Sequence, residues 1–249
     1  MITSFQILGN SAGMPARSRN VSSLMVSTAN FDIMLDCGEG TYLAWRKTGY
    51  KWKHLKYIFI THLHPDHVSG LVPLLFYRKL LSIETPLVIY GPDRLEKLVK
   101  NSVNDMSIHL NYELSIRSVS VASEFELEGG ISVKTAEMEH KIPCYGYRLE
   151  NGDEKNIVFI TDTRPCENAL VLADHAHILI HEATFADENV DMAHNHFHTT
   201  IHQALDNAEK AQVKRLYLTH FSPKLDNARL DRIRFNGWPV ISKGKISLE

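Results

Sequence analysis

The sequence predicts an α/β fold, because short runs of β-branched and aromatic residues alternate with helical patterns along the whole chain. Four of these runs are continuous apolar segments, as expected for strands that are buried on both faces. Each leads to a polar residue that can bind a metal or move a proton: residues 57–61 precede His62, 157–161 precede Asp162, 178–181 precede Glu182, and 216–219 precede His220. Since active groups of this class gather at strand ends, we expect the site there.

Other segments complete the alternation of strands and helices. Residues 199–211 place Ile201, Ala204, Leu205, Ala208 and Ala211 on one face, which predicts an amphipathic helix. Residues 66–81 show the same kind of pattern, with Val68, Leu71, Val72 and Leu75. Alternating runs predict further strands at 23–28, 31–35, 114–119 and 131–138.

Composition limits the class of protein. The chain has 249 residues, of which 44% are hydrophobic and 22% charged, so disordered and collagen-like classes are excluded. No linker divides it, and we expect one domain over residues 1–249. The net charge of −2 gives no global basic field for nucleic acid. No secretory signal or membrane-spanning run is evident, and three cysteines do not suggest a disulfide framework, so we expect a soluble cytoplasmic protein with no membrane partner.

The strongest chemical signal is the segment Thr61-His62-Leu63-His64-Pro65-Asp66-His67. In extended backbone, His62 and His64 point the same way, while Asp66 and His67 follow a proline where a helix should start. Four ligand-type side chains within six residues can serve two neighbouring cations. Imidazole and carboxylate ligands suit zinc, with manganese as a competitor.

This His-x-His-x-Asp-His motif after a strand resembles the metallo-β-lactamase superfamily. The resemblance implies an αββα sandwich, in which two mixed sheets are flanked by helices and the metal site lies at one edge. It also implies that one metal takes His62, His64 and His140, that the other takes Asp66, His67 and His220, and that Asp162 lies between them.

Such a site favours an anionic substrate. Two divalent ions and two aspartates leave a net charge near +2, which suits a phosphodiester. We therefore expect a metal-dependent phosphodiester hydrolase, in which a hydroxide generated by the two metal ions attacks phosphorus and Asp66 orients or deprotonates it.

Further segments narrow the resemblance to the ribonuclease Z family of tRNA 3′-processing endonucleases. These are Gly9 to Pro15 with Arg17, Arg19 and Asn20, then residues 36–41, His181-Glu182-Ala183-Thr184, and His198-Thr199-Thr200. The resemblance implies an RNA substrate, with a tRNA precursor as the candidate, and it suggests a homodimer.

Glu182 and His198 suggest a dyad. A carboxylate that accepts from one imidazole nitrogen fixes the tautomer, so that the other nitrogen can protonate a leaving oxygen. A purely structural hydrogen bond at the strand end is the alternative. Nearby His194 and His196 are interpreted as solvated loop residues, and His202 as a helix-surface residue.

One departure from ribonuclease Z concerns the substrate. That family carries a protruding arm between the positions of His140 and Asp162, but only 21 residues separate them here. They predict a strand over 143–150, a turn over 151–154 and a strand over 156–161. The alternative is therefore a small-molecule phosphodiesterase, for example on cyclic nucleotides, or another hydrolase of this fold acting on a thioester or lactam.

One basic segment of the sequence has two interpretations. Arg46, Lys47, Lys51, Lys53 and Lys56 place five cations within eleven residues, beside aromatic residues. They predict either a phosphate-backbone patch or a solvated loop. Cys144, close to His140 in sequence, is interpreted as an inert thiol rather than a ligand.

Overall fold

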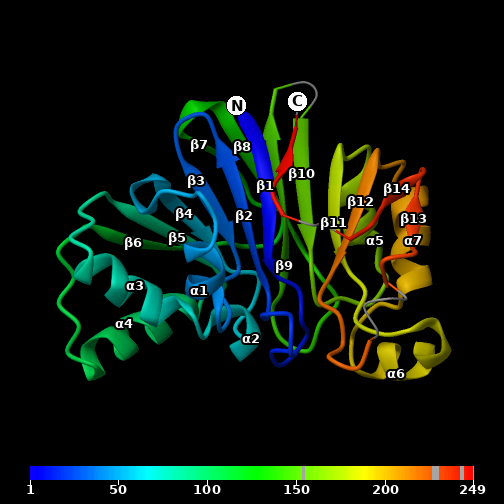
Figure 1. Cartoon of the computed structure of the whole chain (residues 1–249), viewed down its shortest axis with the longest axis horizontal. Coiled ribbons are helices and arrows are strands. Elements are labelled where there is room, and N and C mark those ends of the chain that lie inside the picture. Colours follow the sequence, from blue (N-terminus) through cyan, green and yellow to red (C-terminus); the bar gives the residue numbers. More distant parts are fainter. Residues whose placement is uncertain (153–154, 226–229, 242–243, 249) are drawn as a thin grey trace.

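A computed structural model describes residues 1–152, 155–225, 230–241 and 244–248. Two β-sheets stack face to face, and helices cover the outer face of each sheet (Figure 1). This αββα arrangement confirms the predicted α/β sandwich of two mixed sheets flanked by helices.

The first sheet is mixed, with strand order β15-β1-β2-β3-β4-β5-β6. Strands β15 to β3 pair antiparallel, whereas β3, β4, β5 and β6 are parallel neighbours. The bounds are β1 Ile2–Gly9, β2 Ser23–Thr28, β3 Asp32–Leu35, β4 Leu55–Phe59, β5 Leu87–Gly91, β6 Leu114–Ser118 and β15 Ile246–Ser247.

The second sheet, with order β12-β11-β10-β9-β8-β7, is mixed in the same way. Strands β10, β11 and β12 are parallel, and β7 to β10 pair antiparallel. The bounds are β7 Glu124–Leu127, β8 Ile131–Glu137, β9 Tyr145–Asn151, β10 Lys155–Ile160, β11 Ile178–Glu182 and β12 Arg215–Thr219, and a small ribbon joins β13 Arg234–Phe235 to β14 Trp238–Pro239.

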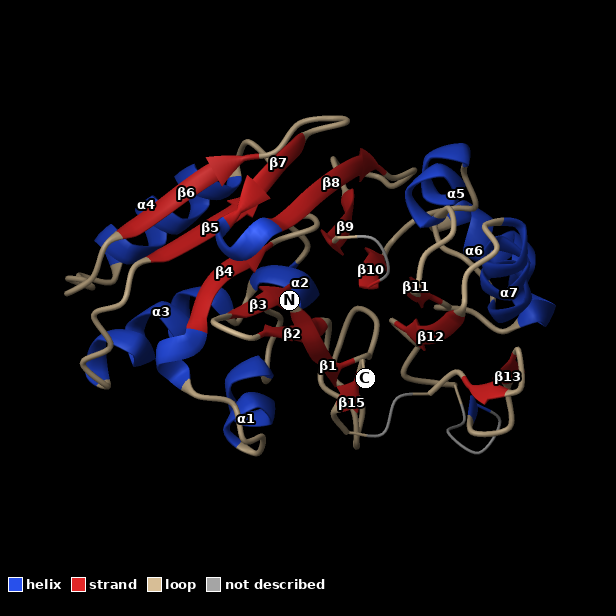
Figure 2. Cartoon of the chain, turned by 90° about the horizontal axis from the view of Figure 1, so that it is seen from above, coloured by secondary structure: helices blue, strands red, loops and turns tan. Residues whose placement is uncertain are grey.

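Helices α1, α3 and α4 lie outside the first sheet, and α5, α6 and α7 lie outside the second (Figure 2). Their bounds are α1 Thr41–Arg46, α2 Pro65–Val68, α3 Leu71–Leu80, α4 Leu95–Asp105, α5 Glu167–Ala173, α6 Val190–Asn195 and α7 Ile201–Lys210. Among the described residues, no helix is both long and apolar enough to cross a membrane.

The helix predicted over 66–81 is in fact two helices, α2 and α3, that are separated at Ser69 and Gly70. The Gly70 N–H donates to the Cys37 carbonyl at 2.8 Å. A Cβ at Gly70 would lie 2.2 Å from the Gly38 carbonyl oxygen. The helical segment is therefore interrupted where its backbone contacts the loop after β3.

Three apolar layers hold the sandwich together. Alternate side chains of a strand point to opposite faces, so Phe59 of β4 packs between the sheets while Ile58 packs against the helices of the first sheet. In β10, Phe159 packs between the sheets and Val158 packs against α5 and α7. Burial on both faces explains why these strands read as continuous apolar runs.

The segment between His140 and Asp162 is a hairpin, as predicted. Strand β9 ends at Asn151 and β10 begins at Lys155, and the two strands pair antiparallel. Residues 153–154 of the predicted turn lie outside the described residues. The connection between the strands is too short for a protruding arm.

Candidate metal centre and active site

The carboxyl ends of six strands meet at one edge of the sandwich. His62 follows β4, Asp162 follows β10, Glu182 ends β11 and His220 follows β12. Parallel pairing of β10, β11 and β12 brings the last three to the same edge. His140 follows β8 across the site, and Asp36 follows β3 beside β4. The topology therefore gathers side chains that are up to 184 residues apart in sequence.

Three of these residues leave their strands through a left-handed backbone turn. Asp36, Asp162 and His220 have φ values of 58°, 46° and 56°. Residues other than glycine seldom adopt this conformation. The turn takes each side chain out of the alternation of its strand and directs it into the site.

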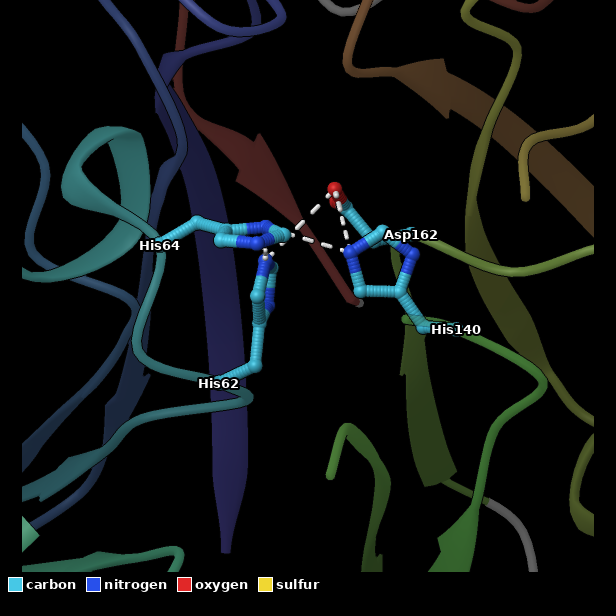
Figure 3. Close-up of side chains that lie close together, drawn as sticks. All are labelled: His62, His64, His140 and Asp162. Atoms are coloured by element: carbon cyan, nitrogen blue, oxygen red, sulfur yellow. Dashed lines mark hydrogen bonds and ion pairs between the residues drawn. The ribbon is translucent and has the colours of Figure 1, made fainter. Parts of the chain in front are cut away.

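The first ligand cluster contains His62, His64, His140 and Asp162, which point toward one another from opposite sides of the site (Figure 3). The Nδ1 atom of His64 lies 3.0 Å from His62 Nε2 and 3.1 Å from His140 Nε2. Asp162 Oδ2 lies 3.6 Å from His62 Nε2 and 3.8 Å from His140 Nε2.

The second cluster contains Asp66, His67 and His220, with the other oxygen of Asp162 beside it. Asp66 Oδ2 lies 3.3 Å from His67 Nε2 and 3.2 Å from His220 Nε2. Asp162 Oδ1 lies 3.2 Å and 3.3 Å from the same two nitrogen atoms. Asp162 thus directs one oxygen to each cluster.

The spacing of these atoms fits metal coordination. Nitrogen and oxygen ligands lie about 2.0–2.2 Å from zinc in a tetrahedral site. Tetrahedral angles then place neighbouring ligand atoms about 3.4 Å apart, and the separations above run from 3.0 to 3.8 Å. The seven predicted ligand residues are therefore spaced so that together they could hold two cations.

Protonation of the first cluster and of both aspartates favours the same use, whereas Asp162 and Asp36 outweigh burial and raise the pKa of His67, so this ring must give up a proton to a bound cation. Burial lowers the pKa of His62 and His64 and brings the pKa of His140 to about 4, so all three rings are neutral at pH 7. Burial acts to raise the pKa of Asp66 and Asp162, but the surrounding histidines outweigh it and lower both. Neutral imidazoles and ionised carboxylates are the forms that bind metal.

Two buried carboxylates behind the ligands orient the rings, and each holds one histidine directly. Asp36 Oδ2 accepts from His67 Nδ1 at 2.7 Å, and Glu182 Oε1 accepts from His198 Nδ1 at 2.9 Å. His67 therefore turns its Nε2 atom to the second cluster, and His198 turns its own toward the pocket.

Each carboxylate also holds a second histidine through a threonine. Thr61 Oγ1 donates to Asp36 and lies 3.0 Å from His62 Nδ1. Thr184 Oγ1 donates to Glu182 Oε2 at 2.7 Å and lies 2.9 Å from His220 Nδ1. Since each hydroxyl proton is committed to a carboxylate, each threonine accepts from its histidine, which leaves Nε2 of both rings for a cation.

Sequence reasoning gave no role to Asp36, Thr61 or Thr184. Asp36 and Thr184 stand inside segments that were matched only as family signatures. Only their positions in the sequence indicate a role at the site: Asp36 follows the predicted strand 31–35, and Thr184 follows Glu182 by two residues.

The Glu182–His198 pair stands at the rim of the site. Glu182 is fully buried and also accepts from the backbone N–H groups of Thr163 and Thr199, at 2.7 Å and 3.1 Å. Burial acts to lower the pKa of His198, but Glu182 outweighs it and raises that pKa to about 9. His198 can therefore carry a proton at pH 7.

A pocket of about 360 Å³ opens over both clusters, lined by Ala12, Gly13, His64, Asp66, His140, Lys141, Asp162, Thr184, Phe185, His196, His198, His220, Ser222 and Pro223. His196, interpreted as a solvated loop residue, is exposed but also lines this pocket. His194 is exposed at the end of α6 and does not line it. His202 is exposed on α7, as predicted.

Other predicted features lie near the site or away from it. Cys144 is buried with Sγ 3.7 Å from His62 Nδ1, and burial raises the pKa of its thiol. Lys56 pairs with Glu128, and Arg46 lies over the Tyr42 ring. Residues 51–56 lead into β4 at the end opposite to His62, so this part of the basic segment does not line the pocket.

The fold and the clustered ligand residues define a protein of the metallo-β-lactamase fold with a candidate metal centre. The chain belongs to the family described as anti-Pycsar protein Apyc1, whose model matches residues 3–238, and it is ribonuclease Z-like within the superfamily. The resemblance to ribonuclease Z is thus confirmed, while the matching family model carries a different description.

Individual relatives agree with this assignment. Ribonuclease Z of Bacillus velezensis is 32% identical over 295 aligned positions, covering 97% of this chain and 96% of the relative. This alignment is longer than the 249 residues of the chain, so the relative contains segments that this chain lacks.

Solved structures agree as well. The short form of human tRNase Z superposes with a TM-score of 0.82 at 28% identity, covering 88% of this chain and 92% of that one. A diphosphatase from the PhnP family has a TM-score of 0.80 at 19% identity, covering 100% and 98%, and shares the fold.

Proposed function

We propose that the chain hydrolyses a phosphodiester at a site for two divalent ions, most favourably zinc, with manganese as the competitor. The observation that carries this proposal is the convergence of seven ligand-type residues in two clusters, with Asp162 turning one oxygen to each. When bound, the two ions would activate water and neutralise the charge that develops on the phosphoryl oxygens.

The residues of the chain have separate roles in this proposal. His62, His64 and His140 would hold one ion, and Asp66, His67 and His220 the other, with Asp162 shared. Asp66 also accepts from the Gly13 N–H at 2.7 Å, which fixes its carboxylate at the pocket floor, where it can orient the attacking water. Asp66 is thereby both ligand and catalytic residue.

His198 would protonate the leaving oxygen. Its Nδ1 atom is bound to Glu182, its Nε2 atom is not committed to that pair, and its side chain is 15% exposed to the pocket. Glu182 keeps the ring oriented and protonated.

The first candidate substrate is a phosphodiester in RNA, including a tRNA precursor. It is supported by the relatives named ribonuclease Z and by the structural likeness to human tRNase Z.

A small phosphodiester such as a cyclic nucleotide is the second candidate. It is favoured by the β9–β10 hairpin, which leaves no room for an arm, and by a matching family whose description names no ribonuclease. The pocket of about 360 Å³ has the size of a small-ligand site.

The decisive experiment compares turnover of one zinc-loaded preparation on a tRNA precursor, on cyclic nucleotides and on chromogenic diesters. Cleavage of any diester with no turnover of a lactam or thioester supports the proposed reaction, and the ratio of kcat/KM values selects the substrate. Turnover of a lactam or thioester alone would overturn it.

Two further properties belong to the proposal. The three cysteines are free, which agrees with a cytoplasmic protein. A homodimer is proposed from the resemblance to ribonuclease Z, and light scattering on the purified protein tests it.

A further inference from the structure

A second groove, of about 410 Å³, lies beside the metal centre. One wall comes from the two loops that carry the first ligand cluster, because Leu63 stands between His62 and His64, and Ile142 follows His140 by two residues. The other wall comes from α4. The groove is therefore continuous in sequence with one rim of the active-site pocket, where His64, His140 and Lys141 stand.

The α4 wall is one face of the helix. Arg94, Lys97, Leu98 and Asn101 all line the groove, and their spacing of three, four and seven residues places them on the same side of a helix. Glu96 and Lys100 do not line the groove and pair with each other at 2.6 Å. The acidic residue of this helix turn is thus already held by a different lysine.

Arg94 and Lys97 are exposed cations that form no ion pair with any carboxylate in the described part of the chain. Leu63, Leu98 and Ile142 give the same groove an apolar surface. Two free cations beside an apolar surface match a nucleotide, which has an anionic phosphate and a base with apolar faces.

We propose that this groove holds the nucleotide next to the scissile phosphodiester in a single strand of RNA. Its phosphate lies against Arg94 and Lys97, and its base lies over Leu63 and Ile142. The inference rests on the proposed phosphodiester hydrolysis and assigns the RNA candidate a path across the surface.

The test measures RNA binding separately from catalysis. A fluorescent single-stranded oligoribonucleotide is titrated with the metal-loaded protein and, in chelator, with the metal-free protein, and anisotropy gives Kd. The double variant Arg94→Ala/Lys97→Ala should raise Kd about tenfold at low salt. It should also reduce the slope of log Kd against log salt by about 1.4, since each single-strand phosphate contact contributes about 0.7.

Matched variants separate this site from a general charge effect. Lys100→Ala removes a cation from the same helix outside the groove and should change Kd by less than about twofold. The charge-conserving variant Arg94→Lys/Lys97→Arg should retain binding and shows that α4 still folds. An unchanged Kd and salt slope in Arg94→Ala/Lys97→Ala, or an equal loss in Lys100→Ala, overturns the proposal.

Turnover distinguishes failure of the groove from failure of the proposed function. If no diester is cleaved, the proposed function fails while the binding titration still decides the groove. If a chromogenic diester is cleaved equally by all variants and RNA binding is unaffected, the hydrolase stands and the groove proposal falls.

Discussion

The Nε2 atoms of His67 and His220 lie 3.3 Å apart, and the other nitrogen of each ring is already committed to an oxygen of the protein. Nδ1 of His67 is held by Asp36, and Nδ1 of His220 by Thr184. The carboxylates of Asp66 and Asp162 lie within 3.3 Å of the same two atoms. Two ring nitrogens and two carboxylates thus surround one point, where they could bind a cation.

We therefore expect two divalent ions per chain after zinc loading, because the two clusters provide more ligands than one tetrahedral ion uses. Replacing Asp162 by Ala should lower the affinity of the second ion more than replacing any single histidine, since Asp162 faces both clusters. Elemental analysis and calorimetric titration measure the stoichiometry. One tight ion or none in the loaded protein would contradict the assignment.

Asp36→Asn should weaken metal binding about 10–100-fold, the usual effect of losing a partner that orients a ligand. Asp36 touches His67 directly and His62 through Thr61. Asp32→Asn is the matched control, because Asp32 is buried at the start of the strand that Asp36 follows and accepts a hydrogen bond from Ser27, away from the ligands. Competition with a zinc chelator measures the zinc affinity of both variants. Equal losses of affinity would show a general effect on folding.

His198→Ala should slow hydrolysis of diesters with poor leaving groups by about 10²–10⁴-fold. The rate should fall much less for diesters whose leaving groups need little protonation, and the variant should still bind both metal ions. His202→Ala, on the exposed face of α7, serves as the control. Equal losses across leaving groups, or loss of an ion, would instead make His198 structural or a ligand.

Glu182→Gln should move the alkaline limb of kcat to lower pH. Glu182 raises the pKa of His198 to about 9, so the acid form exists below that pH and is lost as pH rises through it. Without the carboxylate, burial lowers the pKa of His198 against the weaker opposing effect of Asp162, and bound cations would lower it further. A pH–rate profile with a diester that has a poor leaving group measures the shift. An alkaline limb that does not move would be assigned to the titration of another group.

The sequence was sufficient for the fold class, for the seven candidate metal ligands, and for Glu182 and His198. Strands β4, β10, β11 and β12 are buried on both faces, so each left a continuous apolar run that ended at a site residue. The His-x-His-x-Asp-His segment and the other matched segments indicated the family, and a ribonuclease Z at 32% identity confirms this resemblance.

Other features depend on contacts that local sequence does not record. The break between α2 and α3 arises because Gly70 meets Gly38 from a distant loop. The relay through Thr184 needs β11 and β12 to be neighbours, since it joins Glu182 to His220. His196 lines the pocket beside Phe185, with the two ring centroids 6.2 Å apart, and its position in a histidine-rich loop did not predict this contact.

The left-handed turns at Asp36, Asp162 and His220 have a thermodynamic consequence. Each such residue costs on the order of 1–3 kcal/mol, and the cost falls on the ends of three strands at once. Binding of cations would select the strained arrangement from looser ones, so the rigidity of this edge becomes a function of metal concentration. Amide hydrogen exchange at these three strand ends should then slow when zinc is added, while exchange at the opposite ends of the same strands stays as it was.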